Sequence, residues 1–161
     1  MAAKHHQIVI VGGGTAGITV AAQLLRADKK LDVAIIDPTK KHYYQPAWTL
    51  VGAGVYDFKA TERDEASVIP KNVTWIQQPA QDLQPDDNKV VLGNGDEVTY
   101  DYLVLCPGIQ IDLNGIEGLT ETLGKNDVCS NYTDPKYTWE VLQNFKGGTA
   151  IYTQPATPIK C

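Results

Sequence analysis

QIVIVGGGTAG, residues 7–17, joins a run of β-branched residues to a cluster of glycines. The run Gln7–Val11 is apolar on both faces, which is typical of a strand inside a parallel sheet. A helix is predicted next, because apolar side chains recur at i, i+3, i+4 and i+7: Ile18, Ala21, Ala22 and Leu25. Val33–Ile36 predicts a second strand. These three elements form a βαβ unit, which indicates an α/β fold.

The glycines satisfy the pattern G-x-G-x-x-G, and each position has its own physical reason. Gly12 allows a tight turn, Gly14 lets a pyrophosphate approach the backbone, and Gly17 lets the helix pack closely on the strand. Thr15 and Ala16 open the helix, where free N–H groups and the helix dipole favour phosphates. The position of the pattern between a buried strand and an amphipathic helix makes it specific for a dinucleotide.

Asp37 supports the same interpretation. It follows Gly17 by 20 positions and comes directly after the second predicted strand. A carboxylate there accepts hydrogen bonds from ribose hydroxyls and repels a 2′-phosphate, so NADP is disfavoured. The alternative is an aspartate that only caps the turn before Pro38. The pattern does not distinguish FAD from NAD, because both carry an adenosine diphosphate half.

Composition excludes several other classes of function. The chain has 161 residues and a formal net charge of −5 with no basic block, which argues against nucleic acid as a partner. No apolar run approaches the roughly 20 residues needed to cross a bilayer. The three cysteines, Cys106, Cys129 and Cys161, show neither CxxC nor Cys/His ligand spacing, so no metal site is predicted.

The middle of the chain departs from a plain series of βα units. Residues 42–55 are aromatic and contain glycine, which predicts a loop leading into a short helix, and Val73–Ile76 predicts a third strand. Lys89–Leu92 and Glu97–Tyr100 flank Gly93–Asp96. The Asn-Gly pair between them favours a hairpin with a type I′ turn.

The C-terminal part carries the signal of one more helix and one more strand. Asp134 before Pro135 is typical of an N-cap followed by proline at the first helical position. The helix is expected to end at Gly147, and Ala150–Thr153 predicts a strand after it. We expect three large side chains of the helix to face inward: Trp139, Leu142 and Phe145.

The order of elements resembles the FAD domain of flavoproteins with two dinucleotide-binding domains, the glutathione-reductase-like group. There, a strand like Tyr102–Leu105 precedes an Ala-Thr-Gly motif, which this chain replaces with Cys106-Pro107-Gly108. Gly108 permits close passage of the backbone near the cofactor, and Cys106 is interpreted as a small packing residue. Ala80 matches the position whose backbone meets the adenine. The resemblance implies a Rossmann-like FAD-binding domain, with a parallel sheet plus a three-stranded antiparallel meander, and the start of a second Rossmann-like domain.

Three further segments narrow the resemblance. HYYQP at 42–46, TLVGAG at 49–54 and the tail YTQPATPIKC at 152–161 are similar to sulfide:quinone oxidoreductases, in the branch that includes the mitochondrial enzyme. That family uses FAD, oxidises sulfide at a pair of redox cysteines and reduces a quinone. The resemblance implies that Cys161 is one cysteine of the pair, and Lys160 beside it is a candidate for lowering the thiol pKa.

The same resemblance places Tyr43, Tyr44 and Pro46 on the flavin or quinone side of the site, with ordinary aromatic packing as the alternative. It implies a division into 1–115, the first part of the FAD-binding domain, and 116–161, a linker and the opening of a second, truncated domain. We therefore expect the isolated chain to be inactive without the remainder of the enzyme.

The expected partners and location also follow from the resemblance. Sulfide and a quinone are the small-molecule substrates. Peripheral association with a membrane, the bacterial inner membrane, is expected through a C-terminal portion beyond this chain, and a homo-oligomer is left open.

Two other interpretations stay open at this point. One is a related flavoprotein, either a type II NADH:quinone reductase or a sulfide dehydrogenase, for which the terminal TPIKC would not be needed. The other, of a different class, is a non-catalytic module that binds a nucleotide and docks on a partner.

Overall fold

A computed structural model describes residues 4–153 of the chain. The described residues divide into two compact units. The first comprises residues 4–42 and 63–110, and the second comprises residues 43–62 and 111–153. The predicted boundary between 115 and 116 stays a prediction, and the grouping of 43–62 with the C-terminal part was not anticipated from the sequence.

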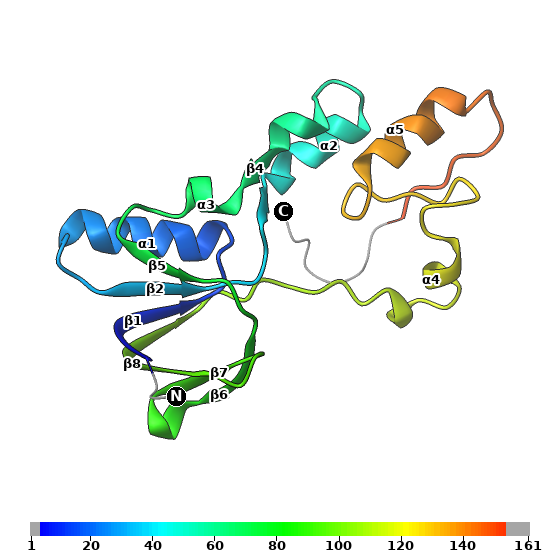
Figure 1. The fold of residues 1–161 in the computed structure, drawn as a ribbon. Helices are drawn as coiled ribbons and strands as arrows, with labels where there is room; N and C mark the ends of the chain where they lie inside the picture. The colour runs from blue at the N-terminus through cyan, green and yellow to red at the C-terminus, as the bar shows by residue number, and fades with distance from the viewer. Residues whose placement is uncertain (1–3, 154–161) are drawn as a thin grey trace. The chain divides into compact units, whose positions relative to one another are not determined.

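The first unit is built on one six-stranded sheet with the order β5-β2-β1-β8-β7-β6 (Figure 1). The neighbouring strands β5, β2, β1 and β8 run parallel to one another, and the pairs β8–β7 and β7–β6 are antiparallel. The elements of the first unit are β1 (Lys4–Val11), α1 (Thr15–Ala27), β2 (Val33–Ile36), α3 (Glu65–Val68), β5 (Val73–Ile76), β6 (Ala80–Gln84), η3 (Pro85–Asp87), β7 (Lys89–Leu92) and β8 (Glu97–Leu105). The short strands β3 (Lys41–Tyr43) and β4 (Glu62–Asp64) form a separate two-stranded sheet. The predicted α/β class with a parallel sheet and a three-stranded meander is confirmed.

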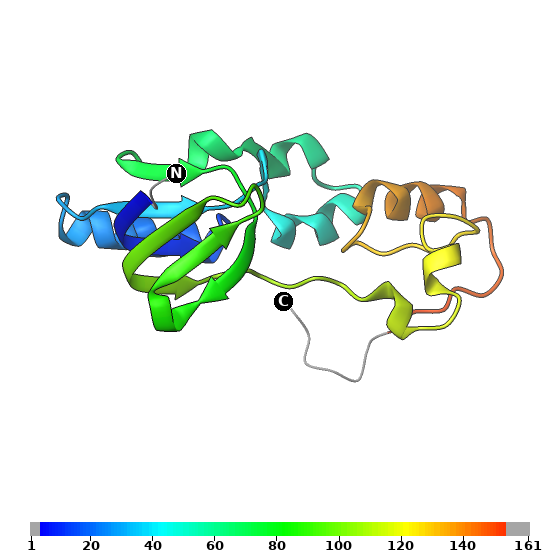
Figure 2. The ribbon, with the colours of Figure 1, turned by 60° about the horizontal axis from the view of Figure 1, so that its bottom comes forward.

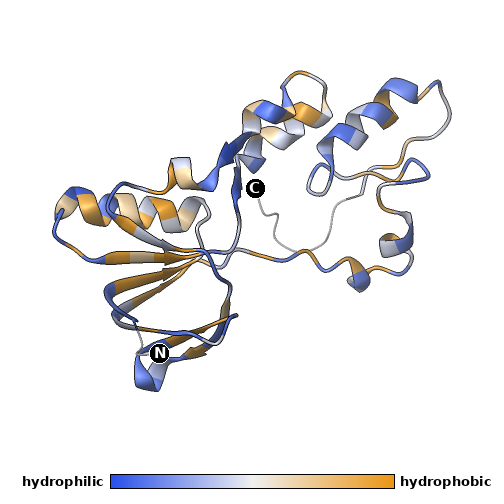
Figure 3. Cartoon of the chain, in the orientation of Figure 1, coloured by the Kyte–Doolittle hydropathy of each residue, from blue (hydrophilic) through white to orange (hydrophobic). Residues whose placement is uncertain are grey.

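Strand β1 is central because both of its faces are buried. Ile8 and Ile10 pack with Ala21 and Leu25 of α1, whereas Val9 belongs to a second cluster on the opposite side. That second cluster joins β1 and β2 to the antiparallel strands, through residues such as Val90, Leu92, Val98 and Tyr100. Figure 3 shows hydrophobic residues running along the central strands. A continuous apolar run is what a strand buried on two faces requires.

Strand β8 connects the two parts of the sheet. It is one strand of 9 residues, where the sequence predicted two short strands separated at Asp101. Lys4 to Val11 of β1 pair with Val98 to Leu105 in parallel, while Glu97 to Thr99 also pair with β7 (Figure 2). The polar Asp101 does not break the strand because its side chain is exposed and lies 3.5 Å from Nε2 of His5.

The hairpin between β7 and β8 has a different turn from the one predicted. The N–H of Gly95 donates to the carbonyl of Leu92 at 2.9 Å, and the N–H of Leu92 donates to the carbonyl of Asp96 at 2.8 Å. Only Gly95 has a positive φ, +84°, and Asn94 does not. A type I′ turn needs positive φ at both central residues, so the type I′ prediction is wrong; this is a three-residue loop with glycine in the left-handed position.

The predicted helix after the glycine-rich turn is confirmed as α1, but its buried stripe differs from the predicted one. Gly17, Ala21 and Leu25 are the buried residues, and Ala22 is exposed. The buried face therefore follows a spacing of four, which places the small Gly17 against the strand.

The second unit contains short helices and one longer helix. These are η1 (Gln45–Ala47), α2 (Trp48–Gly52), η2 (Phe58–Thr61), η4 (Leu113–Gly115), α4 (Leu119–Thr122) and α5 (Pro135–Asn144). The predicted start of α5 is confirmed, because the Asp134 carboxylate accepts from the N–H groups of Lys136 and Tyr137 at 3.0 and 3.2 Å. No helix within residues 4–153 is long and apolar enough to cross a membrane.

Two expectations for the C-terminal part are wrong. Trp139, Leu142 and Phe145 are 37%, 42% and 47% exposed rather than inward-facing, because the described residues cover this side of α5 only in part. Residues 150–153 form no strand, and a strand requires a neighbour to pair its N–H and C=O groups. The start of a second Rossmann-like domain stays a prediction.

We predict that Gly17→Ala destabilises the fold by about 1–3 kcal/mol, because a Cβ there would overlap the carbonyl oxygen of Gly12. Gly14→Ala is the matched control, since its Cβ meets nothing within 4 Å, and it should cost less than about 1 kcal/mol. Urea unfolding measures both. Equal losses in the two variants would contradict this packing of the turn.

Candidate functional site

The glycine-rich turn is held by backbone contacts that leave no room for side chains. The N–H of Gly12 donates to the carbonyl of Ile36 at 2.9 Å, and its φ is +108°. A Cβ at Gly12 would overlap the carbonyl of Cys106, at the end of β8, and one at Gly17 would overlap the carbonyl of Gly12. At this turn, β1, α1 and the end of β8 therefore approach one another closely.

Gly14 has the opposite environment. It is exposed, it is the N-cap of α1, and a Cβ built there would meet nothing within 4 Å. No side chain of the described residues caps the helix at this end, and Thr15 and Ala16 in its first turn are also exposed. The first N–H groups of a 13-residue helix thus face open space, which is the arrangement that binds an anion such as a diphosphate.

Asp37 lies directly behind this turn at the end of β2. Its Oδ2 accepts from the N–H of Gly13 at 2.6 Å, and its Oδ1 accepts from the N–H and hydroxyl of Thr39 at 2.8 and 2.5 Å. The indole N–H of Trp75 donates to the Asp37 carbonyl at 2.9 Å. These contacts fix the carboxylate beside the glycine-rich turn, at the place predicted for a ribose of a bound dinucleotide.

An apolar hollow of about 450 Å³ lies at the carboxyl ends of β1 and β8. Its lining includes Val11, Ala80, Leu105 and Pro107. Gly108 follows Pro107, is exposed and has a φ of +72°, and a Cβ at this position would meet no atom within 4 Å. A flat aromatic ring such as adenine fits an apolar hollow of this kind, beside the phosphate and ribose positions.

All the residues predicted to bind a dinucleotide lie in the first unit: Gly12, Gly14, Thr15, Ala16, Gly17, Asp37, Ala80, Pro107 and Gly108. They bring together an open helix N-terminus, a fixed carboxylate and an apolar surface. This donor set fits the adenosine diphosphate half of a dinucleotide cofactor.

Sequence reasoning missed Glu65, the first residue of α3. It is 1% exposed, and its Oε2 lies 3.4 Å from Nδ1 of His42. A Cβ at Gly13 would lie 2.9 Å from Oε1 of Glu65 and 2.9 Å from Cβ of Asp37. Burial raises the pKa of Glu65; the charge of Asp37 adds to the rise, and His42 opposes it. The only local signal in the sequence was a fourth glycine, Gly13, at a position where the G-x-G-x-x-G pattern does not require one.

The residues predicted for the flavin or quinone side belong to the second unit. The Tyr43 ring lies 5.7 Å from the ring of Trp48 and 5.9 Å from that of Phe58, centroid to centroid. Tyr44 is 59% exposed, and Pro46 is exposed as well. Aromatic packing accounts for Tyr43 within this unit, and contact of the three residues with a flavin stays a prediction.

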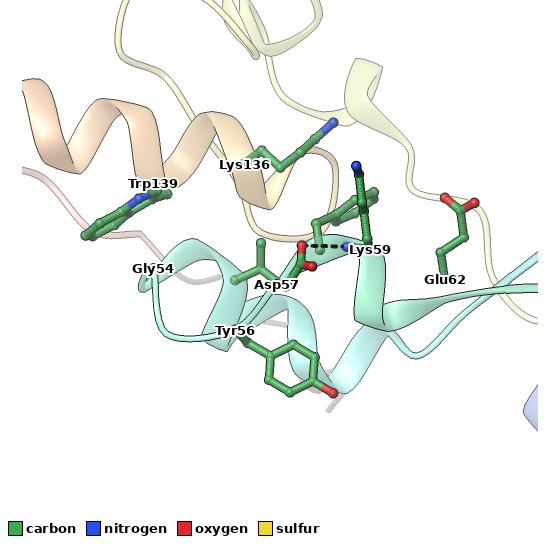
Figure 4. Close-up of a pocket in the computed structure, with 9 residues that line it drawn as sticks. Gly54, Tyr56, Asp57, Lys59, Glu62, Lys136 and Trp139 are labelled. Atoms are coloured by element: carbon green, nitrogen blue, oxygen red, sulfur yellow. Dashed lines mark hydrogen bonds between the residues drawn. The ribbon is translucent and has the colours of Figure 1, made fainter.

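The second unit has a pocket of its own, of about 520 Å³ (Figure 4). Trp139 forms one side, and a Cβ at Gly54 would lie 2.5 Å from its ring. Lys59 and Lys136 also line it, and the Lys136 ammonium lies 4.8 Å above the Phe58 ring. The pocket has no glycine-rich turn, so it does not share the dinucleotide chemistry of the first unit.

The cysteines divide between described and undescribed parts of the chain. Cys106 is half-buried and packs against the cluster between β1 and α1, as the packing interpretation requires. Cys129 is also half-buried. Cys161, the predicted redox cysteine, lies outside the described residues together with Lys160.

Comparison with known proteins gives consistent matches. The chain is 42% identical over 162 residues to mitochondrial sulfide:quinone oxidoreductase of Mus musculus, covering 99% of this chain and 36% of that protein. The corresponding protein of Dictyostelium discoideum is 45% identical over 96% of this chain and 35% of its own length. The crystal structure of sulfide:quinone oxidoreductase from Aquifex aeolicus superimposes with a TM-score of 0.70 and 30% identity, over 88% of this chain and 32% of that chain.

The chain therefore spans about a third of the length of these relatives. The resemblance to sulfide:quinone oxidoreductases expected from the sequence is confirmed. A family model, described as pyridine nucleotide-disulphide oxidoreductase, matches residues 6–143. Because this match includes the glycine-rich turn, Asp37 and the whole six-stranded sheet except the first two residues of β1, the chain belongs to the pyridine nucleotide-disulphide oxidoreductase family.

Proposed function

We propose that this chain forms the FAD-binding part of a sulfide:quinone oxidoreductase. The observation that carries the proposal is the combination of the open Gly14 cradle with the fixed carboxylate of Asp37, in a chain 42% identical to a protein of that name. The family and these relatives imply a flavin cofactor, and FAD is the flavin whose adenosine diphosphate half matches the cradle.

Each part of the site has one role in holding FAD. The backbone at Gly14 and the N-terminus of α1 bind the diphosphate, and Asp37 accepts hydrogen bonds from the adenosine ribose. The hollow lined by Val11, Ala80 and Pro107 takes the adenine. FAD is favoured over NAD because the antiparallel strands β6, β7 and β8 follow the βαβ unit in place of further βα units.

The proposed reaction uses Cys161 and a second cysteine that forms a disulfide with it. Sulfide attacks one sulfur of this disulfide, so that a new sulfur–sulfur bond forms as the old one breaks. One cysteine becomes a persulfide and the other leaves as a thiolate. The outer sulfur of the persulfide then passes to a nucleophilic acceptor, which leaves both cysteines as thiols. Their oxidation back to the disulfide releases two electrons and two protons, and the quinone takes these up to become a quinol; a bound flavin would supply the redox chemistry between the thiols and the quinone. We also propose that the whole enzyme associates peripherally with a membrane, where the quinone is dissolved.

We predict that Gly14→Ala lowers FAD affinity about tenfold, because the added methyl group occupies the path of the diphosphate. Titration of flavin fluorescence against the purified protein measures the dissociation constant. Gly115→Ala is the control, since its Cβ would meet only ordinary contacts at 3.6 Å. The same affinity in Gly14→Ala and the unaltered protein would contradict the placement of the diphosphate.

We predict that Cys161→Ser in the whole enzyme reduces sulfide-dependent quinone reduction at least about 1000-fold, because serine cannot form the disulfide that sulfide attacks. FAD binding should be unchanged. Quinone absorbance measures the rate, and Cys129→Ser is the matched control that keeps activity. Retained sulfide oxidation in the Cys161→Ser variant would exclude this role for Cys161. If the variant oxidises NADH, the enzyme would instead be a type II NADH:quinone reductase.

A further inference from the structure

The side chain of Glu65 has one oxygen without a hydrogen-bond partner in residues 4–153. The Oε1 atom is buried, and the residue as a whole is only 1% exposed. A buried polar atom without a partner costs free energy, so its retention points to a role other than packing. The Oε1 atom lies against Gly13, on the inner side of the nucleotide-binding turn.

Glu65 is also linked to the ribose-binding carboxylate through shared neighbours. Gly13 donates its N–H to Asp37 at 2.6 Å, and the side chains of Asp37 and Glu65 both fill the space where a Gly13 side chain would stand. The position of Gly13, and with it the direction of the Asp37 carboxylate, is therefore set partly by Glu65. Because it is buried, Glu65 acts through these residues and does not contact a ligand.

We infer that Glu65 is a positioning residue of the FAD site, which holds Gly13 and Asp37 for the adenosine ribose and makes FAD affinity depend on the protonation of its own carboxyl. This inference rests on the proposed function of the chain. It adds a residue and a regulation that neither the G-x-G-x-x-G pattern nor Asp37 implies.

The direction of the dependence follows from the charges around Glu65. The titratable groups that face it are Asp37, from the end of β2, and His42, from β3; the neighbouring Lys41 and Asp64 form an ion pair with each other at 2.9 Å. The neutral carboxyl adds no charge beside Asp37 and the incoming diphosphate. Ionised Glu65 repels both, so FAD affinity should fall as pH rises through the pKa of Glu65, which burial raises.

The test is FAD affinity measured between about pH 5 and 9, a range in which the diphosphate of FAD keeps a constant charge. In the unaltered protein, FAD affinity should fall about tenfold as Glu65 ionises. A tenfold change corresponds to a difference of about one unit between the pKa of Glu65 in the FAD-bound and the FAD-free protein. Glu65→Gln keeps the shape and stays neutral, so it should lose most of this fall. Glu117→Gln, an exposed glutamate in the second unit, is the matched control and should keep the full profile.

A second variant keeps the test valid if Glu65→Gln does not fold, as judged by its circular dichroism. His42→Gln removes the group that opposes the rise in the Glu65 pKa, so the midpoint of the affinity profile should move to higher pH. An unchanged midpoint in His42→Gln, or an undiminished fall in Glu65→Gln, would overturn the role of Glu65 while FAD binding itself stands. Absence of FAD binding by the unaltered protein at every pH would overturn the proposed function as well.

Discussion

The contact between two glycines and two carbonyl oxygens is the constraint on which the rest of the first unit depends. Gly12 lies against the Cys106 carbonyl, and Gly17 lies against the Gly12 carbonyl. This lets the central strand, the helix and the end of β8 converge at one point. Any side chain at either glycine would separate these elements, and the helix N-terminus would no longer stand over the ends of the strands.

The same convergence gives the turn two different sides. The turn is packed on its inner side and open on its outer side, where Gly14 meets no neighbouring atom. Asp37 and Glu65 fill the inner side around Gly13, so two carboxyl groups lie behind a turn whose outer face suits a diphosphate. Negative charge on both would oppose an anionic ligand, and burial reduces that opposition by favouring the neutral form of Glu65.

Predictions from the sequence were correct where the structure of a segment depends on residues close to it along the chain. Val33–Ile36 and Val73–Ile76 are strands with the predicted limits, and the Asp134 cap starts α5 as expected. They were wrong where burial depends on distant elements: Ala22 is exposed because α1 packs through Gly17, and Trp139 stays partly exposed because the described residues cover α5 only in part. An apolar residue at helical spacing predicts a face, but the neighbouring element decides whether the face is buried.

The sequence by itself determined the βαβ order, the glycine-rich turn and the position of Asp37 at the end of the second strand, because spacing within about 30 residues specifies them. The tertiary structure decided the joining of the meander to the parallel sheet through β8, and the meeting of Gly13, Asp37 and Glu65. These contacts link positions far apart along the chain. Their geometry arises only when strands pair and helices pack, which no local pattern encodes.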